Sequence, residues 1–176
     1  MARIPLVNPD TVPDELKPLV EQIKRERGGR MLNLYKLLMN SPAIASGWLH
    51  MGTAVRMESS LRGDMRELAI CRVAQISGAN YEWQAHAPIA VKEGVSQAQI
   101  DDLANWSTST VFTDMQRAVL AYAEQITREF DADDSTFAAV RAHFNDQEIM
   151  ELTATIGFYN MVSRILRSLR VDHEEH

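Results

Sequence analysis

Residues 66–88, RELAICRVAQISGANYEWQAHAP, decide how this chain folds. They read as an apolar helix, a short break at residues 77–80, and a second helix that carries Glu82 and His86. Residues four apart share one face of a helix, so these two side chains are predicted to be neighbours. Glu67 lies near the start of the first helix and can approach the same place if the two helices pack as a hairpin. Two carboxylates beside one imidazole are suited to moving protons.

The rest of the chain also predicts helices. No segment alternates strictly between apolar and polar residues, as a half-buried strand would. Capping patterns at Ser96–Gln99 and Asn145–Glu148, and a start signal at Thr113, mark the beginnings of later helices. The last of these helices carries apolar residues at helical spacing from Ile149 to Leu169. The sequence therefore predicts an all-α chain of about seven or eight helices.

Composition and charge limit the partners. A formal net charge of −6 argues against nucleic acid, whose protein partners are usually basic. No apolar run is long enough to span a bilayer, so no membrane partner is expected, and the N-terminus lacks the apolar region of a signal peptide. Cys71 is the only cysteine, which precludes a disulfide within the chain and makes a cytoplasmic location the expectation. Because Cys71 lies in an apolar helical stripe, it is interpreted as an inert core thiol.

The stretch at residues 66–88 resembles the carboxymuconolactone decarboxylase family, which includes AhpD-like alkylhydroperoxidases. The redox branch of that family has a Glu, eleven residues, Cys-x-x-Cys, three residues and a His. Here Glu67 and His86 take the Glu and His positions, while Ala79 and Glu82 stand in place of the two cysteines. The resemblance implies the AhpD-like helical fold and self-association into a homotrimer or homohexamer. Because the acid–base residues are present and both cysteines of the redox branch are absent, the chain resembles the decarboxylase-like branch of the family.

The whole chain, residues 1–176, is predicted to form one domain, because its length suits a single hydrophobic core. The family resemblance covers about residues 33–94 well, and the phrase at residues 156–160 also looks like the family. Three prolines make residues 1–13 an extended arm. Such an arm must lie either on its own domain or on a neighbouring subunit.

The resemblance also implies roles for the central residues. His86 is the expected proton donor, Glu82 its orienting or exchanging partner, and Glu67 a relay that tunes the imidazole. The alternative for Glu82 and His86 is an ordinary pair on a helix surface. A lone histidine, His50, is interpreted as a surface or satisfied core residue rather than a catalytic one.

A substrate site needs walls and a charge partner as well as a proton donor. Tyr81 and Trp83 are expected to line it, although packing in the core or at an interface accounts for these aromatic residues equally well. An anionic substrate needs a cation, and Arg66 and Arg72 are candidates that the sequence does not separate. No metal site is expected, and the His-Glu-Glu-His tail departs from the spacing of the H-E-x-x-H zinc motif.

The expected function is a cofactor-independent decarboxylase-like lyase that acts on a small carboxylated lactone or related organic acid, in aromatic compound catabolism. A conjugated lactone carbonyl accepts the electrons left by carbon dioxide, so no cofactor is needed and the protein supplies a proton and stabilises charge. One alternative is an AhpD-like, peroxiredoxin-type hydroperoxide reductase, whose nucleophile is a thiolate. Another is a non-enzymatic helical assembly that binds a small ligand or a partner protein.

Overall fold

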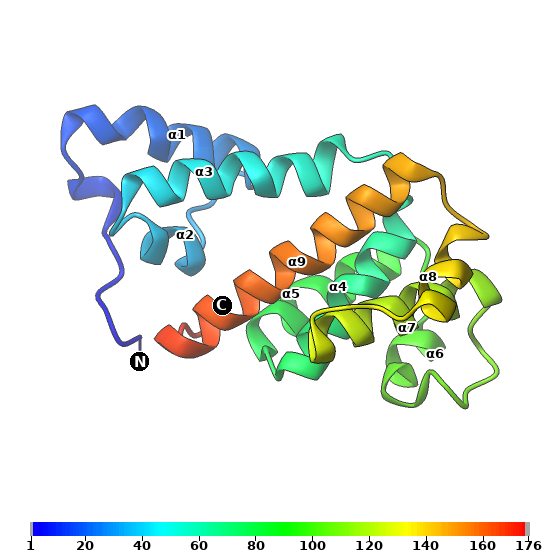
Figure 1. Cartoon of the computed structure of the whole chain (residues 1–176). Helices are drawn as coiled ribbons and strands as arrows, with labels where there is room; N and C mark the ends of the chain where they lie inside the picture. Colours follow the sequence, from blue (N-terminus) through cyan, green and yellow to red (C-terminus); the bar gives the residue numbers. More distant parts are fainter. Residues whose placement is uncertain (1, 175–176) are drawn as a thin grey trace. The chain divides into compact units, whose positions relative to one another are not determined.

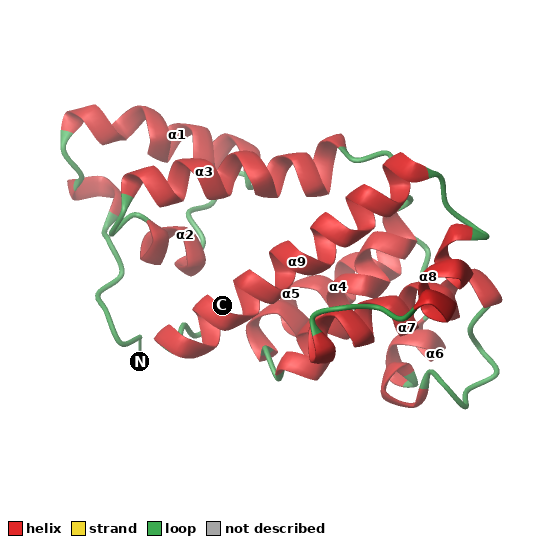
Figure 2. Cartoon of the chain, viewed as in Figure 1, coloured by secondary structure: helices red, strands yellow, loops and turns green. Residues whose placement is uncertain are grey.

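The computed structural model describes residues 2–174, and every regular element in that range is helical (Figure 2). The all-α prediction is confirmed. The structure has nine α-helices within the described range rather than seven or eight, and two of them, α2 and α6, are only six and five residues long. The helices, labelled in Figure 1, are α1 Lys17–Glu26, α2 Asn33–Leu38, α3 Pro42–Thr53, α4 Gly63–Ser77, α5 Asn80–Lys92, α6 Gln97–Asp101, α7 Asp114–Glu129, α8 Asp134–Arg141 and α9 Asp146–Leu169. The shorter turns are η1 Pro9–Thr11, η2 Asp14–Leu16, the π-helical η3 Ala54–Glu58 and η4 Leu103–Asn105.

The chain divides into two compact units. The first comprises the described parts of Met1–Glu58 and Ile165–His176 and contains α1, α2 and α3. The second comprises Ser59–Arg164 and contains α4 to α8 and most of α9. The prediction that residues 1–176 form a single domain stays a prediction.

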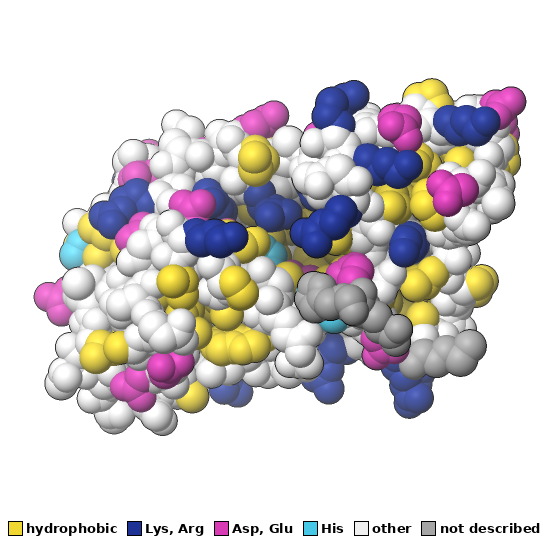
Figure 3. Space-filling model, turned by 180° about the vertical axis from the view of Figure 1, so that it is seen from behind, with side chains coloured by type: hydrophobic (Ala, Val, Ile, Leu, Met, Phe, Trp, Pro, Cys, Tyr) yellow, Lys and Arg dark blue, Asp and Glu magenta, His cyan; other side chains and the backbone are white. Residues whose placement is uncertain are grey.

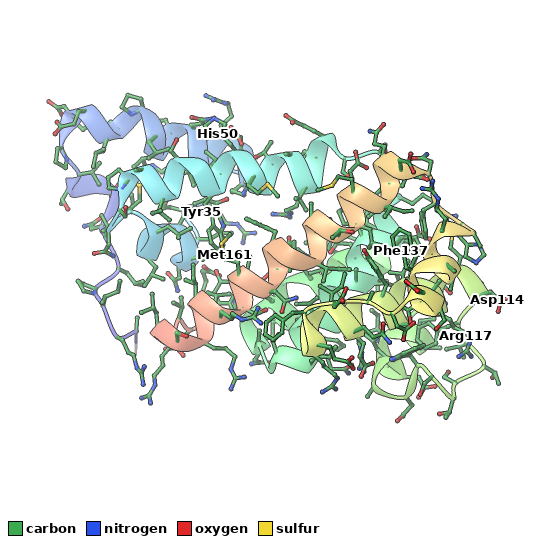
Figure 4. All side chains as sticks on the ribbon, viewed as in Figure 1. Tyr35, His50, Asp114, Arg117, Phe137 and Met161 are labelled. Atoms are coloured by element: carbon green, nitrogen blue, oxygen red, sulfur yellow. The ribbon has the colours of Figure 1, made fainter. Side chains whose placement is uncertain are left out.

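Arg27 joins the three helices of the first unit. Its buried side chain donates from Nε to the hydroxyl of Tyr35 on α2 at 2.9 Å and from Nη2 to Thr53 Oγ1 on α3 at 3.2 Å. Figure 4 labels Tyr35 and also His50, which lies on α3. His50 is exposed and its Nδ1 lies 2.8 Å from Ser46 O, so its interpretation as a surface residue is confirmed.

The N-terminal arm packs on its own chain. Arg3 N donates to Leu169 O at 2.8 Å, and Val7 N donates to Lys36 O at 3.0 Å. All four residues belong to the first unit, so the arm covers the unit from which it starts.

In the second unit, α4 is the central helix. It packs against α5 and α7, and every residue from Met65 to Ala74 is buried (Figure 1). A helix enclosed on all sides is normally apolar all round. This one nevertheless carries Arg66, Glu67 and Arg72 in its buried stretch. Buried charges are costly unless they are paired, so each of these side chains needs a partner inside the protein.

The turn between α4 and α5 produces the predicted hairpin. Gly78 has φ = +60° and ψ = +31°, the left-handed conformation that glycine adopts without a steric penalty. Ala79 N then donates to Ala74 O at 2.8 Å and closes the end of α4, and α5 begins at the next residue. The reversal brings Glu82 and His86 back alongside α4.

Three later helices begin where the sequence predicts. Ser96 and Gln99 form a reciprocal capping box at α6, as do Thr113 and Gln116 at α7. At α9, Glu148 N donates to the Asn145 side chain at 3.0 Å, and Asn145 N donates to the Glu148 carboxylate at 2.9 Å. These local signals fix the N-termini of the helices that surround α4 and α5.

The segment that leads into α4 is held by one carboxylate on α9. Glu151 Oε2 accepts hydrogen bonds from Leu61 N at 2.9 Å, Ser60 Oγ at 2.8 Å and Ser59 Oγ at 2.9 Å. Burial raises the pKa of Glu151, but hydrogen bonds from Gln147, Ser60 and Ser59 outweigh it and lower the pKa from 4.5 to about 2. The ionised form therefore stabilises the folded state.

Replacing Glu151 by glutamine is expected to lower the free energy of unfolding at pH 7 by ~1 kcal/mol, since one acceptor oxygen becomes a donor group and the exposed part of the site is screened by water. Because the folded pKa lies below the unfolded one, the carboxylate's contribution is complete above pH 4.5 and is lost as the pH falls toward 2. Urea unfolding from pH 7 to pH 3 should show the difference between wild type and variant narrowing below pH 4.5. Glu129→Gln, at an exposed position of α7, is the control and should show little difference at any pH. A Glu151→Gln difference that stays constant with pH would contradict this account.

The surface carries charges of both signs. Figure 3 shows Asp and Glu side chains as well as Lys and Arg side chains among hydrophobic ones on one face of the molecule. Of the helices described within residues 2–174, none is both long enough and apolar enough to cross a bilayer.

Candidate acid–base site

Glu67, Glu82 and His86 meet in the second unit, as the sequence predicts. His86 Nδ1 lies 2.6 Å from Glu67 Oε2, and His86 Nε2 lies 3.5 Å from Glu82 Oε2. The three residues are 1%, 3% and 5% exposed, respectively. An ordinary i,i+4 pair on a helix surface would be solvated, so that alternative for Glu82 and His86 is wrong. We call these three residues the acid–base triad.

The short contact between Glu67 and His86 defines the state of the imidazole. A carboxylate oxygen accepts, so Nδ1 carries a hydrogen and donates it to Glu67. In the neutral imidazole this leaves Nε2 as the nitrogen with a lone pair. The same carboxylate stabilises the imidazolium when Nε2 gains a proton, which is the role of the carboxylate in a hydrolase triad.

Arg66 lies behind Glu67 and belongs to the same cluster. Its Nε donates to the other carboxylate oxygen, Glu67 Oε1, at 3.4 Å, and its Nη2 lies 4.0 Å from Glu93 Oε1. The guanidinium thus offsets part of the negative charge that the triad places in a buried site. Both contacts are long for an arginine–carboxylate pair. Arg66 as the partner of a substrate carboxylate stays a prediction.

The structure places Arg72 in a different cluster. Its Nη2 donates to Glu124 Oε2 on α7 at 2.5 Å, and its Nη1 donates to the side chain of Gln75. Trp106 Nε1 donates to the same Glu124 oxygen at 2.9 Å. Arg72 lies five positions after Glu67, a rotation of about 140° around the helix, so the two side chains point to different neighbours. The expectation that Arg72 serves the substrate site is not supported by this position.

The two aromatic residues of α5 are packed inside the second unit. Tyr81 is buried. Trp83 is partly buried and lies against the hydrophobic cluster that contains Leu68, Cys71 and Ala90. Trp83 therefore packs in the core, which is one of the two interpretations that the sequence allows for this residue. The expectation that Tyr81 and Trp83 line a substrate site stays a prediction.

Cys71 has the environment of an inert thiol. It is fully buried in that hydrophobic cluster. Burial raises the pKa of the thiol far above its ordinary value, and the negative charges of Glu67 and Glu82 raise it further. Thiolate chemistry requires the opposite surroundings, namely exposure and nearby positive charge.

Tyr159 is a neighbour of the triad that the sequence did not single out as a site residue. Its hydroxyl lies 3.2 Å from His86 Nε2, although the two residues are 73 positions apart in the sequence. The rings meet edge to face, with centroids 4.9 Å apart and an interplanar angle of 85°. The signal that could have found it is a tyrosine in the buried stripe of α9, because a buried phenol needs a hydrogen-bond partner.

Within residues 2–174, no three acidic, histidine or cysteine side chains are grouped so as to hold a metal ion.

Fold and site together define an all-helical protein with a buried carboxylate–imidazole centre. The family model for the "Carboxymuconolactone decarboxylase family" matches residues 42–125, which include the whole triad. The part of the chain that holds the triad therefore matches this family, and the chain is also similar to an AhpD-like protein of known structure.

Individual relatives and solved structures are also similar to this chain. The chain is 30% identical over 119 residues to the uncharacterized protein YnjA of Escherichia coli (strain K12). The aligned region covers 67% of this chain and 63% of YnjA, so this chain spans less than two thirds of that relative. It is 27% identical, with a TM-score of 0.74 over 80% of this chain and 97% of the other, to a protein of unknown function from Agrobacterium tumefaciens that has been suggested to be the antioxidant defence protein AhpD. The debrominase Bmp8, solved in complex with 2,3,4-tribromopyrrole, shares the fold with a TM-score of 0.79 at 16% identity, over 99% of this chain and 94% of that one.

Proposed function

We propose that this chain is a cofactor-independent acid–base enzyme, a decarboxylase-like lyase that acts on a small carboxylated lactone or related organic acid. The observation that carries the proposal is the buried triad, in which His86 is held between two carboxylates. The match to the family model supports the reaction class, and the burial of Cys71, the only cysteine in the sequence, supports acid–base rather than redox chemistry.

Decarboxylation needs an electron sink and a proton. When the bond to the carboxylate breaks and carbon dioxide leaves, the electron pair moves into the conjugated carbonyl of the substrate. His86 Nε2–H then delivers a proton to the carbon, while the charge on Glu67 has held the imidazolium ready. Glu82 faces the same nitrogen and returns a proton from solvent to it. Arg66 is the cation assigned to the substrate carboxylate.

The test is a direct assay of the purified protein on unsaturated lactone acids. Release of carbon dioxide should be measured for β,γ- or α,β-unsaturated lactone carboxylates and for the corresponding saturated lactone acids. Turnover confined to the unsaturated compounds is the expected result, since only they can accept the electron pair. Tight binding without turnover of any lactone acid would favour a non-enzymatic ligand-binding protein instead.

Hydroperoxide reduction is the second candidate, and the likeness to the Agrobacterium protein favours it. Such a reaction consumes a thiolate, and the chain offers only the buried Cys71. Peroxide consumption with a dithiol donor, measured beside the lactone assay, separates the two candidates.

Replacing Cys71 by alanine is expected to leave lactone-acid turnover within about twofold of wild type, because the thiol has no part in the proton transfer. The lost sulfur should lower the free energy of unfolding by ~1 kcal/mol through a small cavity. Steady-state kinetics and urea unfolding of the same preparation measure both effects. A loss of peroxide turnover in this variant, from a wild type that has it, would instead establish the second candidate.

A further inference from the structure

We infer that Tyr159 is a positioning residue for His86, and that its hydroxyl fixes Nε2 as the nitrogen that exchanges protons. This inference rests on the proposed function for its catalytic meaning, but the contact itself is structural. It adds a residue from α9 to a site that the sequence builds from α4 and α5 alone.

Both ring nitrogens of His86 face a partner. Nδ1 donates to Glu67 at 2.6 Å and is thereby committed. Nε2 faces the Tyr159 hydroxyl at 3.2 Å and the Glu82 carboxylate at 3.5 Å. Only the Nε2 side therefore has partners that can change with the protonation state of the ring.

The Tyr159 hydroxyl and the Glu82 carboxylate have different hydrogen-bonding roles at Nε2. When the imidazole is neutral, Nε2 needs a donor, and the phenol O–H supplies it. When Nε2 carries a proton it becomes a donor, and either the phenol oxygen or the Glu82 carboxylate accepts from it. A tyrosine is suited to this position because its hydroxyl both donates and accepts, so neither state of the buried ring is left with an unsatisfied polar atom.

Ring packing holds the hydroxyl in place. The Tyr159 ring meets the imidazole edge to face at 4.9 Å, and it meets the Phe158 ring at 5.6 Å with an interplanar angle of 85°. Tyr159 is 3% exposed. Phenylalanine at this position would keep the ring contacts and remove only the hydroxyl, which makes Tyr159→Phe a clean test.

Charged and titratable groups approach His86 from each helix packed against it. From α4 comes Glu67, with Arg66 behind it and the Cys71 thiol under the influence of its charge; from α5 comes Glu82; from α9 comes Tyr159. Removing the phenol hydroxyl deprives the neutral ring of its donor, whereas Glu82 still accepts from the protonated ring. The equilibrium between the neutral and the protonated His86 ring is therefore expected to shift toward the imidazolium when the hydroxyl is removed.

The experiment is ¹⁵N NMR of histidine-labelled protein, titrated from pH 5 to pH 9. The His86 signals are assigned by their loss in His86→Gln. In wild type, the neutral ring should show a protonated Nδ1 and an acceptor Nε2. In Tyr159→Phe, the titration midpoint of His86 should rise by ~0.5–1 pH unit, the equivalent of one neutral hydrogen bond.

Tyr122→Phe is the matched control. Tyr122 is a buried tyrosine of α7 whose hydroxyl lies 2.9 Å from Thr153 Oγ1 on α9. The Tyr122→Phe variant therefore also loses a hydrogen bond to α9, but not one that involves His86. Its His86 titration should equal that of wild type. An equal midpoint in Tyr159→Phe and Tyr122→Phe would overturn the inference, and so would a wild-type ring protonated on Nε2 in its neutral state.

Enzyme kinetics separate this inference from the proposed function. If Tyr159→Phe shifts the His86 midpoint and also the pH profile of lactone-acid turnover by the same amount, both stand. If the midpoint shifts but wild type turns over no lactone acid, the proposed function fails and the role of Tyr159 in holding His86 remains. If turnover falls with no change at His86, the hydroxyl acts elsewhere and the inference is wrong.

Discussion

His86→Gln is expected to lower kcat/KM for lactone-acid turnover by ~10²–10⁴-fold, the range typical of losing a general acid. Glutamine retains an amide N–H that can reach Glu67, so the buried carboxylate keeps a donor and the fold survives. What disappears is the imidazole that takes up and delivers the proton. Steady-state kinetics, with circular dichroism and thermal unfolding on the same sample, measure both parts of the expectation.

The control for this variant is His50→Gln. His50 is an exposed residue of α3 in the first unit, so its replacement removes an imidazole without touching the triad. Turnover of His50→Gln should match wild type. Full activity in a folded His86→Gln protein would reject His86 as the proton donor.

Glu67→Gln is expected to produce the second large effect. The amide can still accept from His86 Nδ1, but it has no charge with which to stabilise the imidazolium, and a flipped amide would favour the wrong tautomer. The comparable Asp-to-Asn change in a serine protease costs about 10⁴ in kcat, so we expect a loss of ~10²–10⁴-fold here. The free energy of unfolding should also fall by ~2–4 kcal/mol, because Arg66 loses a buried charge partner.

Glu93→Gln is the matched control, since Glu93 is the other carboxylate that faces Arg66. Its side chain is 43% exposed and lies 4.0 Å from the guanidinium, so the change should cost less than ~1 kcal/mol and leave kcat unaffected. The two variants are compared by urea unfolding and by single-turnover kinetics. Equal effects at the two positions would mean that Glu67 serves only to neutralise Arg66.

Much of the site could be predicted from the sequence because it depends on local geometry. The i,i+4 spacing places Glu82 and His86 on one face whatever surrounds them, and the Gly78 turn brings that face back to Glu67. The capping boxes of α6 and α7 are equally local. The family resemblance then gave these residues a chemical meaning that spacing alone does not supply.

What the sequence did not predict depends on tertiary packing. Arg66 and Arg72 are the same residue type on the same helix, so the sequence does not distinguish them. Only the position of Glu124 on another helix assigns Arg72 to a different cluster. Tyr159 reads as one more apolar residue of α9 until the fold places its hydroxyl against His86. The number of helices was also underestimated. The homotrimeric or homohexameric assembly stays a prediction.

The enclosure of α4 has a consequence for the motions open to this protein. Amide hydrogens of a segment buried from Met65 to Ala74 exchange with solvent only when the surrounding unit opens cooperatively. Glu67 lies within this buried stretch, so we expect it to open slowly. We therefore expect the contact between Glu67 and His86 to be lost together with the packing of α4, rather than by local fraying of a helix end.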